Sequence, residues 1–176
     1  MWFAGALKEW REFYLLIGTA GATLLALLFV AVSLGAGYIS DRKAIGIRTF
    51  MSPVVIHFAC IFFISALVLV PAHRDSFFAT LIGAAAVIGA VVSAFTAVQV
   101  MRSNFSNYVL DYFAYGHFPA LGYLGLLVAA VLVYLGNERA LDVLAGSLLA
   151  LTIVNIRNVW DLTLSMVRQQ ARRRRG

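Results

Sequence analysis

Long apolar runs alternate with short polar breaks along the whole chain. The runs are Tyr14–Tyr38, Pro53–Val70, Phe77–Met101, Phe118–Leu135 and Leu141–Val154, and the last continues as a mixed segment to Val167. Each is close to the length, about 20 residues, that an α-helix needs to cross a hydrocarbon layer of about 30 Å. The pattern therefore predicts five transmembrane helices, over residues 14–38, 53–70, 77–101, 118–135 and 141–167.

The breaks between the runs contain the residues that end helices. They are Ser40–Lys43, Pro71–Asp75, Arg102–Asn107 and Gly136–Glu138. The second and fourth links are so short that the helices on either side must run antiparallel. We therefore expect an all-α fold, a polytopic membrane helical bundle that forms a single transmembrane domain over residues 1–176.

Residues 103–117 are too polar to span a membrane and too aromatic for an ordinary loop. On a helix, one face would carry Phe105, Tyr108, Val109, Tyr112 and Phe113. This pattern is typical of a helix that lies in the membrane interface. We favour an aromatic belt at the surface over a substrate-binding platform.

Composition supports the membrane interpretation. Of the 176 residues, 62% are hydrophobic and 12% are charged, whereas about a quarter of a soluble domain is charged. Cys60 is the only cysteine, so neither an intramolecular disulfide nor a thiolate cluster can form within one chain.

The positions of Lys and Arg predict the orientation. Five spans place nine of these residues on one side and four on the other. The first group is Arg42, Lys43, Arg48, Arg102, Arg168 and Arg172–Arg175, and the second is Lys8, Arg11, Arg74 and Arg139. Because the side richer in Lys and Arg stays cytoplasmic, we expect the N-terminus outside and the C-terminus in the cytoplasm.

The basic tail, residues 168–176, is expected to contact anionic lipid headgroups. Its cations are Arg168, Arg172, Arg173, Arg174 and Arg175. Each basic residue near such a surface contributes about 1 kcal/mol. No aromatic residues are interleaved with these arginines, so we expect no nucleic-acid partner.

Small residues recur every fourth position in two of the runs. The first run carries Gly18, Ala22 and Ala26, and the third carries Ala85, Gly89, Ser93 and Ala97. Small residues in register let helices approach closely in lipid. These are predicted contact faces, either within one chain or between chains.

Several polar residues fall inside the predicted spans. They are Ser33, His57, Gln99, Asn155, Arg157, Asn158 and Asp161. With the predicted topology they gather in the cytoplasmic leaflet, where polar groups are expected to face the bundle. Two interpretations remain open for Arg157, which either belongs to a functional polar site with Asp161 at i+4 or reaches the interface beside Trp160.

Motifs for chemistry are missing from the sequence. His57 and Cys60 share a helix face and His117 lies at a similar level, but neither HExxH nor CxxC occurs, so we expect no metal site and no cofactor. A structural or proton-sensing role for His57 is the alternative. GxxxxGK[ST] and GxSxG are also missing, so we expect no enzyme.

The first helix resembles that of a group of small bacterial multi-span membrane proteins. Trp10, Phe13, Tyr14 and Gly18, followed by 27–33 (LLFVAVS), are similar to their pattern of WxxFF, a glycine and GLLFVAxS, with Ala26 in place of a glycine. The segment 155–162 (NIRNVWDL) is similar to an IRNAWDL ending in such proteins. The resemblance implies the bacterial inner membrane, and some of these proteins are described as modulators of a membrane-anchored AAA protease.

Two functions follow as expectations. The first is a non-enzymatic integral membrane protein that acts through helix and lipid contacts, as an accessory or regulatory subunit or as a homo-oligomer. The second is a small oligomeric ion channel or transporter, in which several chains surround a path lined by Ser33, His57, Gln99, Asn155 and Arg157.

Overall fold

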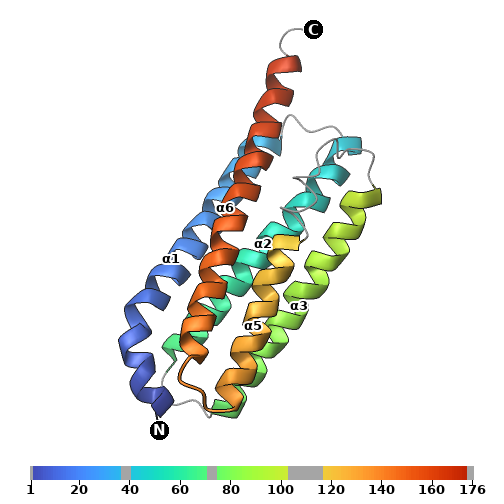
Figure 1. Ribbon diagram of the computed structural model, residues 1–176. Coiled ribbons are helices and arrows are strands. Elements are labelled where there is room, and N and C mark those ends of the chain that lie inside the picture. Colours follow the sequence, from blue (N-terminus) through green and yellow to red (C-terminus); the bar gives the residue numbers. More distant parts are fainter. Residues whose placement is uncertain (1, 37–40, 71–74, 103–116, 174–176) are drawn as a thin grey trace.

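Five long helices lie side by side in one elongated bundle (Figure 1). The computed structural model describes residues 2–36, 41–70, 75–102 and 117–173, and this part of the chain contains no strand. The helices are α1 (Trp2–Ala36), α2 (Asp41–Leu69), α3 (Asp75–Arg102), α5 (Phe118–Tyr134) and α6 (Ala140–Arg173). The start of α1 and the end of α6 lie at opposite ends of the bundle.

The five apolar runs correspond to the five helices, and four of the helices begin before their runs, whereas α5 begins at Phe118 as its run does. α1 begins at Trp2, α2 begins at Asp41 and continues through Pro53, and α6 ends at Arg173. Hydropathy marks only the apolar part of a helix, whereas the backbone hydrogen bonds continue into polar sequence. Of the predicted interfacial helix over 103–117, residues 103–116 lie outside the described residues, as do 174–176 of the basic tail.

Three helices are long and apolar enough to cross a membrane. The stretches with sufficient length and hydropathy are Lys8–Ser33, Asp75–Gln99 and Ala140–Asp161. The apolar stretches Pro53–Leu69 and Phe118–Tyr134 are shorter. All-helical structure and membrane-length apolar helices are therefore features of the described chain.

A tight turn joins α5 to α6. Gly136 has a φ of 69°, a left-handed conformation that costs glycine little. Its N–H donates to the Val133 carbonyl oxygen at 3.0 Å, and the Asn137 N–H donates to Leu132 at 2.9 Å, which is the Schellman pattern of helix ends. The Asn137 side chain accepts a bond from the Arg139 N–H at 2.9 Å. This link, predicted from its breakers, sets α5 and α6 antiparallel.

Contacts between successive helices and between helices distant in sequence hold the bundle together. α1 packs on α2, α3 on α5, and α5 on α6, while α6 also contacts α1 and α2. The Tyr14 hydroxyl donates to the Leu141 carbonyl oxygen at 3.0 Å, and both residues are buried. This bond joins the first helix to the last.

Glycines permit the closest helix contacts. A Cβ on Gly18 would lie 2.9 Å from the Ser65 Cβ, and a Cβ on Gly122 would lie 2.6 Å from the Leu151 side chain. The tightest site joins α3 to α5, because a Cβ on Gly89 would overlap the Tyr123 ring. No other residue type fits at these positions without movement of a neighbour.

The two predicted small-residue faces have different outcomes. On α3, Ala85, Gly89 and Ser93 are buried and Ala97 is half-buried. On α1, Gly18 is buried and Ala22 is half-buried, but Ala26 is exposed. Ala26 therefore takes no part in the packing within one chain, where the nearby Leu28 is buried instead. A contact of this face between chains stays a prediction.

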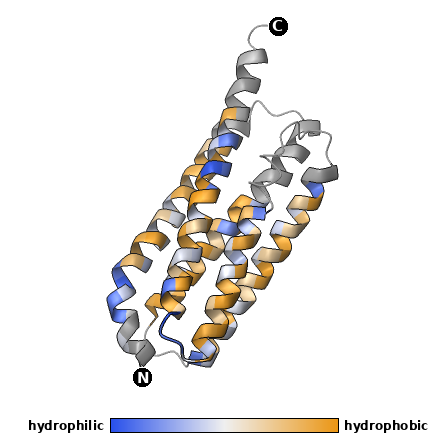
Figure 2. Ribbon diagram, in the orientation of Figure 1, coloured by the Kyte–Doolittle hydropathy of each residue, from blue (hydrophilic) through white to orange (hydrophobic). Residues whose placement is uncertain are grey.

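Large hydrophobic side chains lie on the outside of the bundle as well as in its core. Figure 2 shows hydrophobic residues along every helix. The core contains large buried side chains such as Phe58, Phe78 and Leu126, while Leu16, Phe95 and Leu121 are exposed. An apolar outer surface of this extent is unfavourable in water.

We predict that Gly89→Ala destabilises the bundle by about 1–3 kcal/mol, the usual cost of overpacking a close-packed core. The Tyr123 ring is fully buried, so it cannot make room for the added methyl group by moving to the surface of the bundle. The measurement is the thermal unfolding midpoint of the purified protein in detergent.

The matched control is Gly83→Ala on the same helix. Its Cβ would lie 3.8 Å from the Ala130 Cβ, an ordinary contact. It should unfold at the parental temperature or slightly above, because alanine favours helix over glycine by about 1 kcal/mol. Equal midpoints for the two variants would contradict the close approach of α3 and α5.

Candidate functional site

A buried polar contact joins α2 and α5 in the interior of the bundle. The His57 Nδ1 and the Tyr123 hydroxyl oxygen are 2.6 Å apart, a short hydrogen bond. Their rings are tilted by 44° with centroids 5.3 Å apart. His57 is 1% exposed and Tyr123 is fully buried. The pair is therefore isolated from the surroundings of the bundle.

Three helices position this pair. His57 and Cys60 share one face of α2, as their spacing predicted, and the Cys60 thiol lies close enough to the Tyr123 hydroxyl to interact with it. The Tyr123 ring lies against Gly89 of α3, where any side chain would block it. We call these four residues, His57, Cys60, Gly89 and Tyr123, the tyrosine site.

One ring nitrogen of His57 in the tyrosine site has no hydrogen-bond partner among the described residues. A neutral imidazole has one N–H and one bare nitrogen, and only Nδ1 has its partner in Tyr123. The His57 Nε2 is buried without a hydrogen-bond partner among the described residues. Whether Nε2 donates or accepts depends on which way the Tyr123 proton points, because that bond fixes the tautomer.

α6 places a second set of polar side chains in the interior. Asn155 is fully buried and Asn158 is 1% exposed. The Asn155 Nδ2 donates to the Leu151 carbonyl oxygen at 2.8 Å, while its Oδ1 has no hydrogen-bond partner within the described chain. Together with His57 Nε2, it is a buried polar atom able to hydrogen-bond a further group.

Four buried serine and threonine hydroxyls form hydrogen bonds only within their own helices. Ser93, Thr96, Ser147 and Thr152 each donate to the carbonyl oxygen four residues earlier, at 2.7–2.8 Å. These bonds satisfy the hydroxyls within their own helices and join no two helices. In contrast to Tyr14 and Tyr123, they hold no helix to another.

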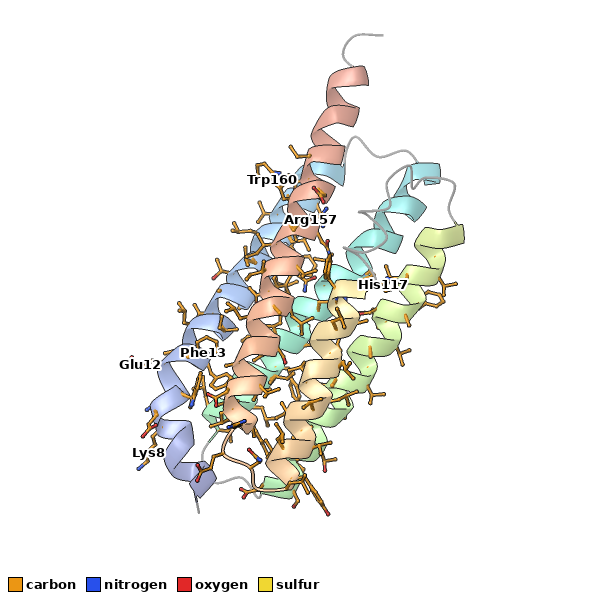
Figure 3. The ribbon with its side chains drawn as sticks, in the orientation of Figure 1. Lys8, Glu12, Phe13, His117, Arg157 and Trp160 are labelled. Carbon is orange, nitrogen blue, oxygen red and sulfur yellow. The ribbon has the colours of Figure 1, made fainter. Side chains whose placement is uncertain are left out.

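The predicted polar residues divide into an inner and an outer group. His57, Asn155 and Asn158 are buried, and Gln99 and Asp161 are intermediate. Ser33 is exposed and donates to the Phe29 carbonyl oxygen at 2.8 Å. Arg157 is exposed and its Nε lies 3.8 Å from the Asp161 Oδ2. Figure 3 shows Arg157 and Trp160 on the distal part of α6 and His117 at the start of α5.

Sequence reasoning missed Tyr123 and Tyr14, whose hydroxyls make the bonds between helices. The signal for Tyr123 was available, since a tyrosine in the middle of an apolar span needs a partner for its hydroxyl. The nearby glycines, Gly122 and Gly125, also indicate close packing, and in the structure both lie against α6, at Leu151 and Ser147. No sequence pattern near Tyr123 identified His57 as the hydrogen-bond partner of its hydroxyl.

The described residues contain no group of three or more His, Cys, Asp or Glu side chains that could hold a metal ion. Protein-family models, curated proteins and solved structures were all compared with the chain, and none matches. The tyrosine site consists of a buried hydrogen bond between α2 and α5 and a close packing contact of α5 with α3.

We predict that Tyr123→Phe lowers the free energy of unfolding by about 1–3 kcal/mol, because it leaves His57 buried without its bond. The control is Tyr134→Phe on the same helix, where the hydroxyl is at an exposed residue and its loss should have little effect.

A double-mutant cycle with His57→Leu isolates the bond from the packing change. The coupling free energy should be at least about 0.6 kcal/mol, the average for such bonds in membrane proteins. Additive effects of the two substitutions would mean that the His57–Tyr123 bond contributes nothing to stability.

Proposed function

We propose that the chain is a polytopic membrane protein of five membrane-crossing helices that acts without catalysis. Its function in this proposal is to make helix and lipid contacts, as an accessory or regulatory subunit of a membrane assembly or as a homo-oligomer. The observation that carries the proposal is the apolar outer surface. Each described helix contributes to it, for example through Leu16, Phe62, Phe95, Leu121 and Ile153, which are all exposed.

The proposal includes α2 and α5 among the spans. α5 has 17 residues, which rise about 26 Å at 1.5 Å per residue, and a shorter span is accommodated by local thinning or by its flanking residues. α2 has 29 residues in all. Both lie alongside the three longer helices in the bundle (Figure 1), so the same membrane layer would enclose all five.

A small oligomeric channel or transporter is the second candidate. It is favoured by buried polar atoms that have no hydrogen-bond partner among the described residues, two of which are His57 Nε2 and Asn155 Oδ1. A path within one chain would pass these two residues. Ser33 and Arg157 are exposed, so they could line only a path between chains.

We propose the bacterial inner membrane as the location, with the N-terminus outside and the C-terminus in the cytoplasm. The location rests on the resemblance of the first helix, and the orientation on the distribution of Lys and Arg. An odd number of spans agrees with the opposite ends at which α1 starts and α6 finishes.

We predict that alkaline phosphatase fused after residue 176 is inactive in a bacterial host, because phosphatase folds only outside the cytoplasm. A fluorescent protein fused at the same site should be bright. Phosphatase fused in the link between α5 and α6, at Glu138, should be active and serves as the control. An active C-terminal phosphatase fusion would overturn the five-span topology.

Two measurements test the proposed function: cross-linking, which detects assembly, and the flux of protons and small ions across vesicles. We predict that cross-linking in native membranes captures the chain in a defined complex, either with itself or with a second membrane protein, and that purified protein in sealed vesicles conducts neither protons nor small ions. A chain that remains strictly monomeric and solitary would contradict the proposal. Flux abolished by His57→Leu, with Ser33→Ala unaffected, would instead support the channel.

A further inference from the structure

One face of α6 combines small residues, an arginine and a tryptophan. Gly146, Ala150, Ile153, Arg157 and Trp160 follow one another at alternating steps of four and three residues, and all five are exposed. Residues at this spacing share one face of a helix. We call these five residues the arginine face. It turns away from the core, which α6 contacts through residues such as Leu144, Leu148 and Leu151.

The charge on this face is incompletely paired. The Arg157 Nε lies 3.8 Å from the Asp161 Oδ2, and the two side chains are 42% and 37% exposed. This distance is longer than a hydrogen bond, and no other described residue forms a salt bridge with the guanidinium. Arginine presents several N–H donors in a planar fork that matches a phosphate group.

The depth of each residue on the arginine face fits a single membrane leaflet. Trp160 is one residue from the end of the membrane-length stretch Ala140–Asp161, where tryptophan prefers the headgroup level. From Arg157 to Gly146 the helix rises about 16 Å, close to half of a hydrocarbon layer of about 30 Å. An added Cβ on Gly146 would meet nothing within 4 Å, so the helix backbone is open along the part that faces the acyl region.

We propose that the arginine face binds a phospholipid with an anionic headgroup. Its phosphate contacts the Arg157 guanidinium, Trp160 lies beside the glycerol region, and one acyl chain runs over Ile153, Ala150 and Gly146. This inference rests on the membrane placement in the proposed function. A second copy of α6 fits the face less well, because a parallel symmetric pair would bring two copies of Arg157 together, and like charges repel.

The test uses Trp160 as the reporter. Trp2 and Trp10 are the other tryptophans, so the full chain with Trp2→Phe and Trp10→Phe has one fluorophore. It is reconstituted in phosphatidylcholine vesicles that contain a minor fraction of either brominated phosphatidylglycerol or brominated phosphatidylcholine. Bromine on the acyl chain quenches only a tryptophan in contact with that lipid.

We expect brominated phosphatidylglycerol to quench Trp160 more effectively than brominated phosphatidylcholine, with a relative affinity of about fivefold. Arg157→Gln should remove the preference, and Asp161→Asn should increase it by leaving the arginine unpaired. Arg139→Gln, an exposed arginine at the other end of α6, is the control and should leave the preference unchanged.

The possible outcomes distinguish a failure of the proposed lipid site from a failure of the proposed membrane placement. Equal quenching by both lipids would overturn the lipid site and leave the membrane placement standing. A preference that persists in Arg157→Gln would assign it to the basic tail and also overturn the site. Quenching that disappears as the protein-to-lipid ratio rises would mean that a second copy covers the face. No quenching by either lipid would overturn the membrane placement itself.

Discussion

The contact between the Tyr123 ring and Gly89 constrains three of the five helices at once. The ring occupies the space that a side chain on α3 would need, and from there its hydroxyl reaches His57 on α2. Moving α5 away from α3 would therefore also break a bond to α2. In the membrane setting that we propose, burial from water does not drive helices together. Close packing and such bonds would then do so, and Tyr123 supplies both.

Tyr14 provides the same kind of connection elsewhere in the bundle. It joins α1 to α6, whereas Tyr123 joins α5 to α2, so each tyrosine ties helices that are distant in sequence. Serine and threonine hydroxyls bond within their own helices instead, because their short side chains reach the preceding turn more easily than a neighbouring helix. A long, rigid side chain with a terminal hydroxyl is suited to the longer distance.

The number and approximate positions of the helices could be predicted because an apolar run is recognised from neighbouring residues alone, and its length indicates a helix. Which faces meet was only partly predictable. Gly18 and Ala26 lie on one stripe of α1, yet only Gly18 reaches α2 and Ala26 is exposed. The His57–Tyr123 contact spans 66 residues of sequence, and no periodic pattern indicates a partner at that distance. Arg157 was ambiguous because its spacing fits both an ion pair and an interfacial role.

The buried and exposed polar groups suggest different contributions to the proposed function. The tyrosine site satisfies most of its polarity inside the chain, and large side chains such as Phe58, Phe78 and Leu126 fill the core around the helices. Such an interior stabilises one arrangement of the bundle. Arg157, in contrast, holds its charge at the outer surface, where salt-bridge pairing among the described residues is limited to the distant Asp161 carboxylate, so its other N–H groups are available for the lipid contact that we propose. A protein that acts through contacts needs this division, because a rigid interior lets the surface present the same groups to every partner.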